Sequence, residues 1–277
     1  MKLSRILALV LLGIALLGFG CGKKAPSDPD KALVAVVDAV KANKPGDLWV
    51  LLPPSYQKDV QDVATAATTK LDKELFELAV QVIDKAVVVV DKQGDKLTPP
   101  ITADQRKLIK DGHAALKDSG LLDYGTVSKL DVPAFLKSGG TKLMVFGIET
   151  FKAKDAKGYE EFQKGLDSIQ VKVIKTEGDK SELEVTLTGP DGKPTTDKLQ
   201  MVKVEGCWLP ADMAASWKAM LPTVKSQVDS GLGELTKNKA DVKQALTGLL
   251  AMLTKAEGGD LTGLDLGPLT GMLDQIK

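Results

Sequence analysis

The sequence has few of the side chains that usually carry anion binding. Its 277 residues include only two arginines, Arg5 and Arg106. Arginine supplies the planar donor that clamps phosphates and carboxylates from two sides. The chain carries 37 basic and 37 acidic residues, so it has no net charge with which to attract nucleic acid over a distance. These absences count against phosphoryl transfer and against nucleic-acid binding.

Histidine and cysteine are also scarce. The chain has one histidine, His113, and two cysteines, Cys21 and Cys207. Zinc sites need several such ligands, and a Ser/His/Asp triad would have to use His113, with only Asp111 close by in the sequence. We therefore predict no metal, no cofactor and no enzymatic activity.

Aromatic residues make up 4% of the chain, so the core must consist mostly of leucine, valine and alanine. Four aromatic residues stand near proline-containing loops and have two possible roles: Trp49, Tyr56, Trp208 and Trp217. They can line a ligand pocket, which is typical of aromatic side chains in concave sites. They can also anchor a core that is otherwise poor in large side chains, and this second role is the more common one.

Residues 1–20 have the pattern of a secretory signal. A short basic start precedes an uncharged apolar run over residues 6–17, which is shorter than the roughly 20 residues that a membrane span needs. The small residues Gly18 and Gly20 stand at −3 and −1 of a cut before Cys21. Residues 21–29 are polar and contain two prolines, so we expect them to form a tether rather than part of the fold.

The stretch LLGFGCGKK around Cys21 resembles the signal of bacterial lipoproteins, in which a cysteine after small residues receives acyl chains. Gly20 and Cys21 match that pattern, whereas Leu17 lies one place too early and Phe19 fills a position that is usually small. The resemblance covers residues 1–24 and implies an exported protein, anchored by a lipidated Cys21 and facing the periplasm or the exterior. Gly22 is not aspartate, which by the same resemblance favours the outer membrane. Cleavage that leaves a free Cys21, and a Cys21–Cys207 disulfide, remain the alternatives.

The rest of the chain predicts an α+β fold in one domain over residues 30–277. Apolar spacings of three and four indicate helices over 30–165 and again over 210–277, where Pro222 is expected to break the first helix. Between them, within 166–209, apolar and polar residues alternate. This alternation predicts an antiparallel meander of three strands, or slightly more, at about 169–205, with a bulge at Met201-Val202.

One motif suggests catalysis. Ser55 and Lys58 fit S-x-x-K, and Lys137 opens a K-S-G tripeptide; penicillin-binding proteins and serine β-lactamases use such a pair. No S-x-N element lies between them, and Ser55 after Pro53-Pro54 is better explained as a helix N-cap. A serine hydrolase is therefore the remote alternative.

Residues 33–47 (LVAVVDAVKANKPGD) and 201–209 (MVKVEGCWL) resemble the first helix and the last strand of NTF2-like, or cystatin-like, lipoproteins. The resemblance spans about residues 30–210. It implies a curved sheet packed on helices and, as an alternative function, a pocket for a small apolar ligand. Our expectation is a membrane-anchored module that binds another envelope protein. The sequence identifies neither that partner nor the oligomeric state.

Overall fold

The structure is a computed structural model that describes residues 25–189 and 191–262. Residues 1–24, with the predicted signal and Cys21, lie outside the described part, as do residues 263–277. The contacts group into two compact units where the sequence predicted one domain. Of the described residues, unit 1 comprises those within 25–66 and 130–228, and unit 2 comprises those within 67–129 and 229–262.

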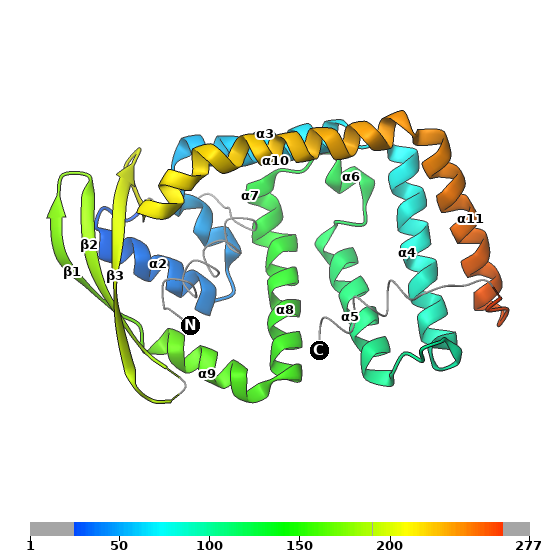
Figure 1. The fold of residues 1–277 in the computed structure, drawn as a ribbon, viewed down its shortest axis with the longest axis horizontal. Coiled ribbons are helices and arrows are strands. Elements are labelled where there is room, and N and C mark those ends of the chain that lie inside the picture. Colours follow the sequence, from blue (N-terminus) through cyan, green and yellow to red (C-terminus); the bar gives the residue numbers. More distant parts are fainter. Residues whose placement is uncertain (1–24, 190, 263–277) are drawn as a thin grey trace. The chain divides into compact units, whose positions relative to one another are not determined.

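Unit 1 holds the sheet, the helical elements that directly precede it and the first helical elements of the described chain (Figure 1). Its helical elements are α2 (Pro29–Lys41), the 3-10 helix η1 (Pro45–Leu51), α7 (Val132–Phe135), the π-helix η3 (Leu136–Gly140), α8 (Thr141–Lys154) and α9 (Ala156–Asp167). Its strands are β1 (Gln170–Glu177), β2 (Lys180–Thr188), β3 (Pro194–Val204) and β4 (Cys207–Pro210). Two helices begin in unit 1 and end in unit 2: α3 (Pro54–Thr69) and α10 (Ala211–Lys237).

Unit 2 is helical in its described part. It contains α4 (Lys73–Gln93), the 3-10 helix η2 (Gly94–Lys96), α5 (Ala103–Ser119), α6 (Tyr124–Val127) and α11 (Lys239–Glu257). Thr102 caps α5 in a complete capping box, because its side chain accepts from the Gln105 N–H while the Gln105 side chain accepts from the Thr102 N–H. The α+β fold expected from the sequence is confirmed.

The sheet is an antiparallel meander in the order β1-β2-β3-β4. The sequence predicted three strands or slightly more, and the fourth is the segment Cys207–Pro210, which pairs with β3. Glu205 and Gly206 form the turn between β3 and β4 with φ of 49° and 86°, as a two-residue hairpin turn of this hand requires. The bulge expected at Met201-Val202 is wrong, because that part of β3 pairs regularly with β2; the register shifts in β1 instead, between Val173 and Lys175.

One face of the sheet packs against α2. Alternate residues of β2, Leu183 and Val185, are 0% and 2% exposed and form a core with Met201, Trp208 and Leu33 of α2. This period-two burial is what the alternating sequence predicts, since every second side chain of a strand points to the same face. The opposite face carries polar pairs, such as Glu182 with Lys198.

Two segments bear on the helices predicted from the sequence, the one around Pro222 and the one over residues 143–151. Pro222 does not break the helix but lies inside α10, on an exposed face, where water can replace the backbone hydrogen bond that proline removes. The apolar segment 143–151 belongs to α8, within the range 30–165 in which the sequence predicts helices.

In unit 2, α4 and α11 run side by side in the same direction (Figure 1). Their buried seam contains Val82 and Val89 of α4 and Leu253 and Ala256 of α11. The direction follows from the ion pairs at the ends. Residues at the start of α4 pair with the start of α11, and Lys85 and Lys92 of α4 pair with Glu257, the last residue of α11.

The seam predicts unequal effects of truncating two neighbouring residues of α11. Leu253 is 1% exposed and Met252 is 43% exposed. Leu253→Ala should lower the free energy of unfolding by about 2–5 kcal/mol, because it leaves a cavity between the helices. Met252→Ala should change it by less than about 0.5 kcal/mol. Urea unfolding followed by circular dichroism measures both, and equal effects would contradict the assignment of the seam.

Candidate functional site

The four aromatic residues predicted as ligand-binding lie in two different cores of unit 1. Trp49, Tyr56 and Trp217 belong to one core, and Trp208 belongs to the core between the sheet and α2. Each is 4–6% exposed. Their packing supports the role of core anchors, and ligand binding by these residues stays a prediction.

Tyr56 and Trp217 hold α3 and α10 together within unit 1. Their rings stack with centroids 4.2 Å apart and planes within 2° of parallel. The Trp217 indole N–H donates to Asp59 Oδ2 at 3.0 Å, and the Tyr56 hydroxyl donates to the Ala214 carbonyl at 3.4 Å. Burial, together with the negative charges of Glu205 and Asp59, raises the pKa of Tyr56. The polar ends of both rings thus have protein partners, as buried Tyr and Trp usually do.

Ser55 and Lys58, the S-x-x-K pair, each contact other groups. Ser55 is not the N-cap that the sequence predicted, because the helix already begins at Pro54, a residue well suited to the first helical position. The Ser55 N–H donates to Glu205 Oε2 at 2.9 Å, and hydrogen bonds from the Ser55 hydroxyl and N–H lower the pKa of Glu205. The carboxylate of Glu205, held out by the β3–β4 turn, therefore caps α3 from another part of the chain.

The two lysines of the proposed serine hydrolase site are also engaged elsewhere. Lys58 Nζ lies 2.6 Å from Asp62 Oδ2, one turn further along α3, and the Lys58 side chain is 74% exposed. The stem of Lys137 lies so close to Gly46 that a side chain at position 46 would meet the Lys137 Cγ at 2.9 Å. Neither contact directs an amine toward the Ser55 hydroxyl.

His113, the single histidine, has a partner that the sequence did not indicate. Its Nε2 lies 2.6 Å from Asp84 Oδ1, so the pair joins α5 to α4 within unit 2. Lys117 Nζ lies 3.9 Å from the same Asp84 oxygen. A histidine beside a carboxylate makes two of the three members of a catalytic triad, but among the described residues no hydroxyl or thiol contacts the other imidazole nitrogen of His113. The geometry therefore describes a bridge between helices.

Cys207 lies in β4 and is 6% exposed. Burial, followed by the nearby charge of Glu205, raises the pKa of its thiol. A thiol with a raised pKa is a poor nucleophile. Among the described residues, Cys207 is a free cysteine, and three or more His, Cys, Asp or Glu side chains nowhere come together as a metal site.

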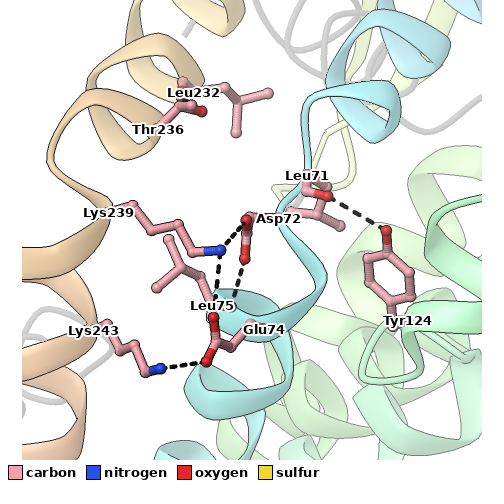
Figure 2. A network of polar contacts seen from close by, with 9 residues as sticks. All are labelled: Leu71, Asp72, Glu74, Leu75, Tyr124, Leu232, Thr236, Lys239 and Lys243. Atoms are coloured by element: carbon pink, nitrogen blue, oxygen red, sulfur yellow. Dashed lines mark hydrogen bonds and ion pairs between the residues drawn. The ribbon is translucent and has the colours of Figure 1, made fainter.

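The densest polar network of unit 2 lies where α4 and α11 begin (Figure 2). Asp72 caps α4 by accepting from the Leu75 N–H at 3.1 Å and also pairs with Lys239 at 2.7 Å. Lys239 reaches Glu74 at 3.3 Å, and Lys243 pairs with the other oxygen of Glu74. Hydrogen bonds from these lysines lower the pKa of Asp72 and of Glu74 and, in return, raise the pKa of Lys239.

Each charge in this network pairs across the seam, so the cluster is a structural clamp. The network offers a ligand no unpaired charge of the kind that an anion site needs. Tyr124, which donates to the Leu71 carbonyl at 3.4 Å, extends the same clamp toward α6. A second clamp closes the opposite end of the seam, where Lys85 and Lys92 lie 2.6 and 2.7 Å from the two carboxylate oxygens of Glu257.

Comparison with known proteins adds no assignment. No protein-family model matches the chain, and no curated protein matches it. The resemblance of residues 30–210 to NTF2-like lipoproteins therefore stays a prediction.

The second clamp predicts a pH-dependent contribution to stability. Hydrogen bonds from Lys85 and then Lys92 lower the pKa of Glu257 from 4.5 to about 2. Because the folded-state pKa is depressed, the stabilisation is complete above pH 4.5 and is lost as the pH falls toward about 2. Glu257→Gln should lower the thermal unfolding midpoint at neutral pH, and its difference from the wild type should disappear near pH 2.

Glu160→Gln is the matched control for this measurement. Glu160 is 70% exposed and lies 4.0 Å from Lys164, so its removal should leave the midpoint unchanged at either pH. A Glu257→Gln protein that melts with the wild type at neutral pH, or that still differs from it near pH 2, would contradict the clamp.

Proposed function

We propose that the protein is an exported lipoprotein, anchored through an acylated Cys21 to a membrane of the bacterial envelope, and that its folded part is a non-catalytic binding module. The observation that carries this proposal is the sequence LLGFGCGKK, in which an apolar run and small residues directly precede a cysteine. The helix α2 begins at Pro29, so the described fold starts shortly after the proposed anchor.

The position after the anchor supports the outer membrane as the destination. Gly22 stands there, and the resemblance to lipoprotein sorting signals assigns retention in the inner membrane to aspartate. The folded part then faces the periplasm or the exterior. Within residues 25–189 and 191–262, no helix combines the length and the apolar character needed to cross a membrane.

Two features of the described residues support binding rather than catalysis. First, the groups with catalytic potential contact structural partners: Ser55 contacts Glu205, and His113 contacts Asp84. Second, unit 1 exposes apolar side chains, among them Val145 and Phe151 of α8, which are 41% and 39% exposed. Large apolar side chains that are exposed to water gain free energy when another molecule covers them.

Metabolic labelling tests the anchor. In cells fed an alkyne-bearing fatty acid, the wild-type protein should carry the label, and Cys21→Ser should carry none, because the acyl acceptor is gone. Cys207→Ala should label like the wild type, since the Cys207 thiol is buried. An unlabelled wild type, or a label that persists in Cys21→Ser, would contradict the proposal.

A fluorescent penicillin tests the absence of S-x-x-K chemistry. We expect no covalent labelling of the purified protein, because the amine of Lys58 pairs with Asp62 rather than with the Ser55 hydroxyl. A covalent label that disappears in Ser55→Ala would show a serine nucleophile and would replace the binding module with a hydrolase.

A further inference from the structure

The first described residues are held against the sheet of unit 1. The indole N–H of Trp208, in β4, donates to the Ser27 carbonyl at 2.8 Å. Trp208 is itself fixed in the core, where it is 6% exposed and packs with Leu33, Leu183 and Met201. The chain is therefore attached to the fold at Ser27, two residues before α2 begins.

Charged side chains surround this attachment point. Lys203 of β3 places its ammonium 5.5 Å from the centroid of the Trp208 ring. Asp28 pairs with Lys31 at 2.5 Å; the hydrogen bond from Lys31 and its positive charge lower the pKa of Asp28, and the positive charge of Lys203 lowers it further. Together these contacts connect the start of α2 to the end of the sheet where β3 and β4 meet.

The chain between Cys21 and Ser27 is too short to let the fold move far from an anchor at Cys21. Whatever conformation it has, a chain extends by at most about 3.3–3.6 Å per residue, so these six steps span at most about 20 Å. This limit is smaller than the length of the β2–β3 ladder. That ladder runs from Lys180 and Val202 to Thr188 and Pro194, eight steps of about 3.3 Å each, or about 26 Å.

We infer that the end of the sheet at Lys203 and the β1–β2 turn, next to the buried Trp208, is the surface of unit 1 that faces the lipid headgroups. This inference rests on the proposed acylation of Cys21 and adds to it the orientation of the folded unit. The partner of this surface is the bilayer that holds the acyl chains. The opposite end of the sheet, at the β2–β3 turn, points away from the membrane and is free for other molecules.

Two lysines provide matched positions for a test. Lys203 lies at the end attached to Ser27, and Lys193 lies next to the β2–β3 turn at the other end, where its side chain is 82% exposed. Lys203→Cys and Lys193→Cys remove the same charge and add the same thiol. Each full-length, membrane-extracted protein is labelled with a donor dye and reconstituted into phosphatidylcholine vesicles that contain headgroup-labelled acceptor lipid.

Energy transfer to the lipid should be higher from position 203 than from position 193. Inserting about 30 Gly/Ser residues between Lys24 and Ala25, with an average span of about 30 Å, should reduce the transfer at position 203 and abolish the difference. Transfer that is equal at the two positions, higher at 193, or unchanged by the spacer would overturn the orientation.

Two controls separate this inference from the proposed anchor. The parent protein should take up no dye, since Cys207 is buried and an acylated Cys21 has no free thiol. Dye uptake by the parent, or failure of the protein to remain with the vesicles, would overturn the anchor and the orientation together. A parent without dye that stays with the vesicles, combined with equal transfer at the two positions, would overturn the orientation alone.

Discussion

The hydrogen bond from Trp208 to the Ser27 carbonyl is the interaction that fixes the start of unit 1 to its sheet. The Trp208 ring fills the core between the sheet and α2, and its N–H fixes the Ser27 carbonyl. The Trp208 side chain thus packs the sheet against α2 and holds the residues that directly precede α2. In a chain with 4% aromatic residues, the few large rings carry much of the core. If Cys21 is acylated as proposed, the hydrogen bond to Ser27 limits which end of the sheet can lie near the membrane.

Two kinds of contact hold α4 and α11 together in unit 2: the buried apolar seam and the ion pairs at both ends of that seam. Parallel helices place like ends of their dipoles side by side, and the lysines at the start of α11 and Glu257 at its end oppose the dipole of α11 itself. These charges form ion pairs with α4, which is acidic at its start and basic at its end. Isolated surface ion pairs contribute little, so the apolar seam supplies most of the stability and the two clamps select the parallel direction.

The elements that the sequence predicted correctly are those set by local chemistry. The period-two burial of β2 and the helices before and after the sheet follow from the spacing of apolar residues close in sequence. The errors arose where distant residues decide. Glu205, rather than Ser55, caps α3 from a turn 150 residues away. Pro222 stays in α10 because its face is exposed.

The candidate sites show the same limit. The sequence identified Ser55, His113 and the four aromatic residues as the groups worth testing, and it favoured structural roles for them. It did not identify Asp84, Asp59 or Glu205 as their partners, because those pairings depend on how helices and strands come together. Cys21 differs from all of these residues, since its proposed chemistry is read from a contiguous stretch and needs no tertiary contact.

The central claim is that the mature chain begins with an acylated cysteine directly ahead of a fold attached at Trp208. Mass spectrometry of the N-terminal peptide, from protein extracted from the membranes of the native cells, measures this most directly. The account predicts a peptide that begins at Cys21 and carries the mass of its acyl chains. A peptide that begins at an unmodified Cys21, or that retains residues 1–20, would contradict it.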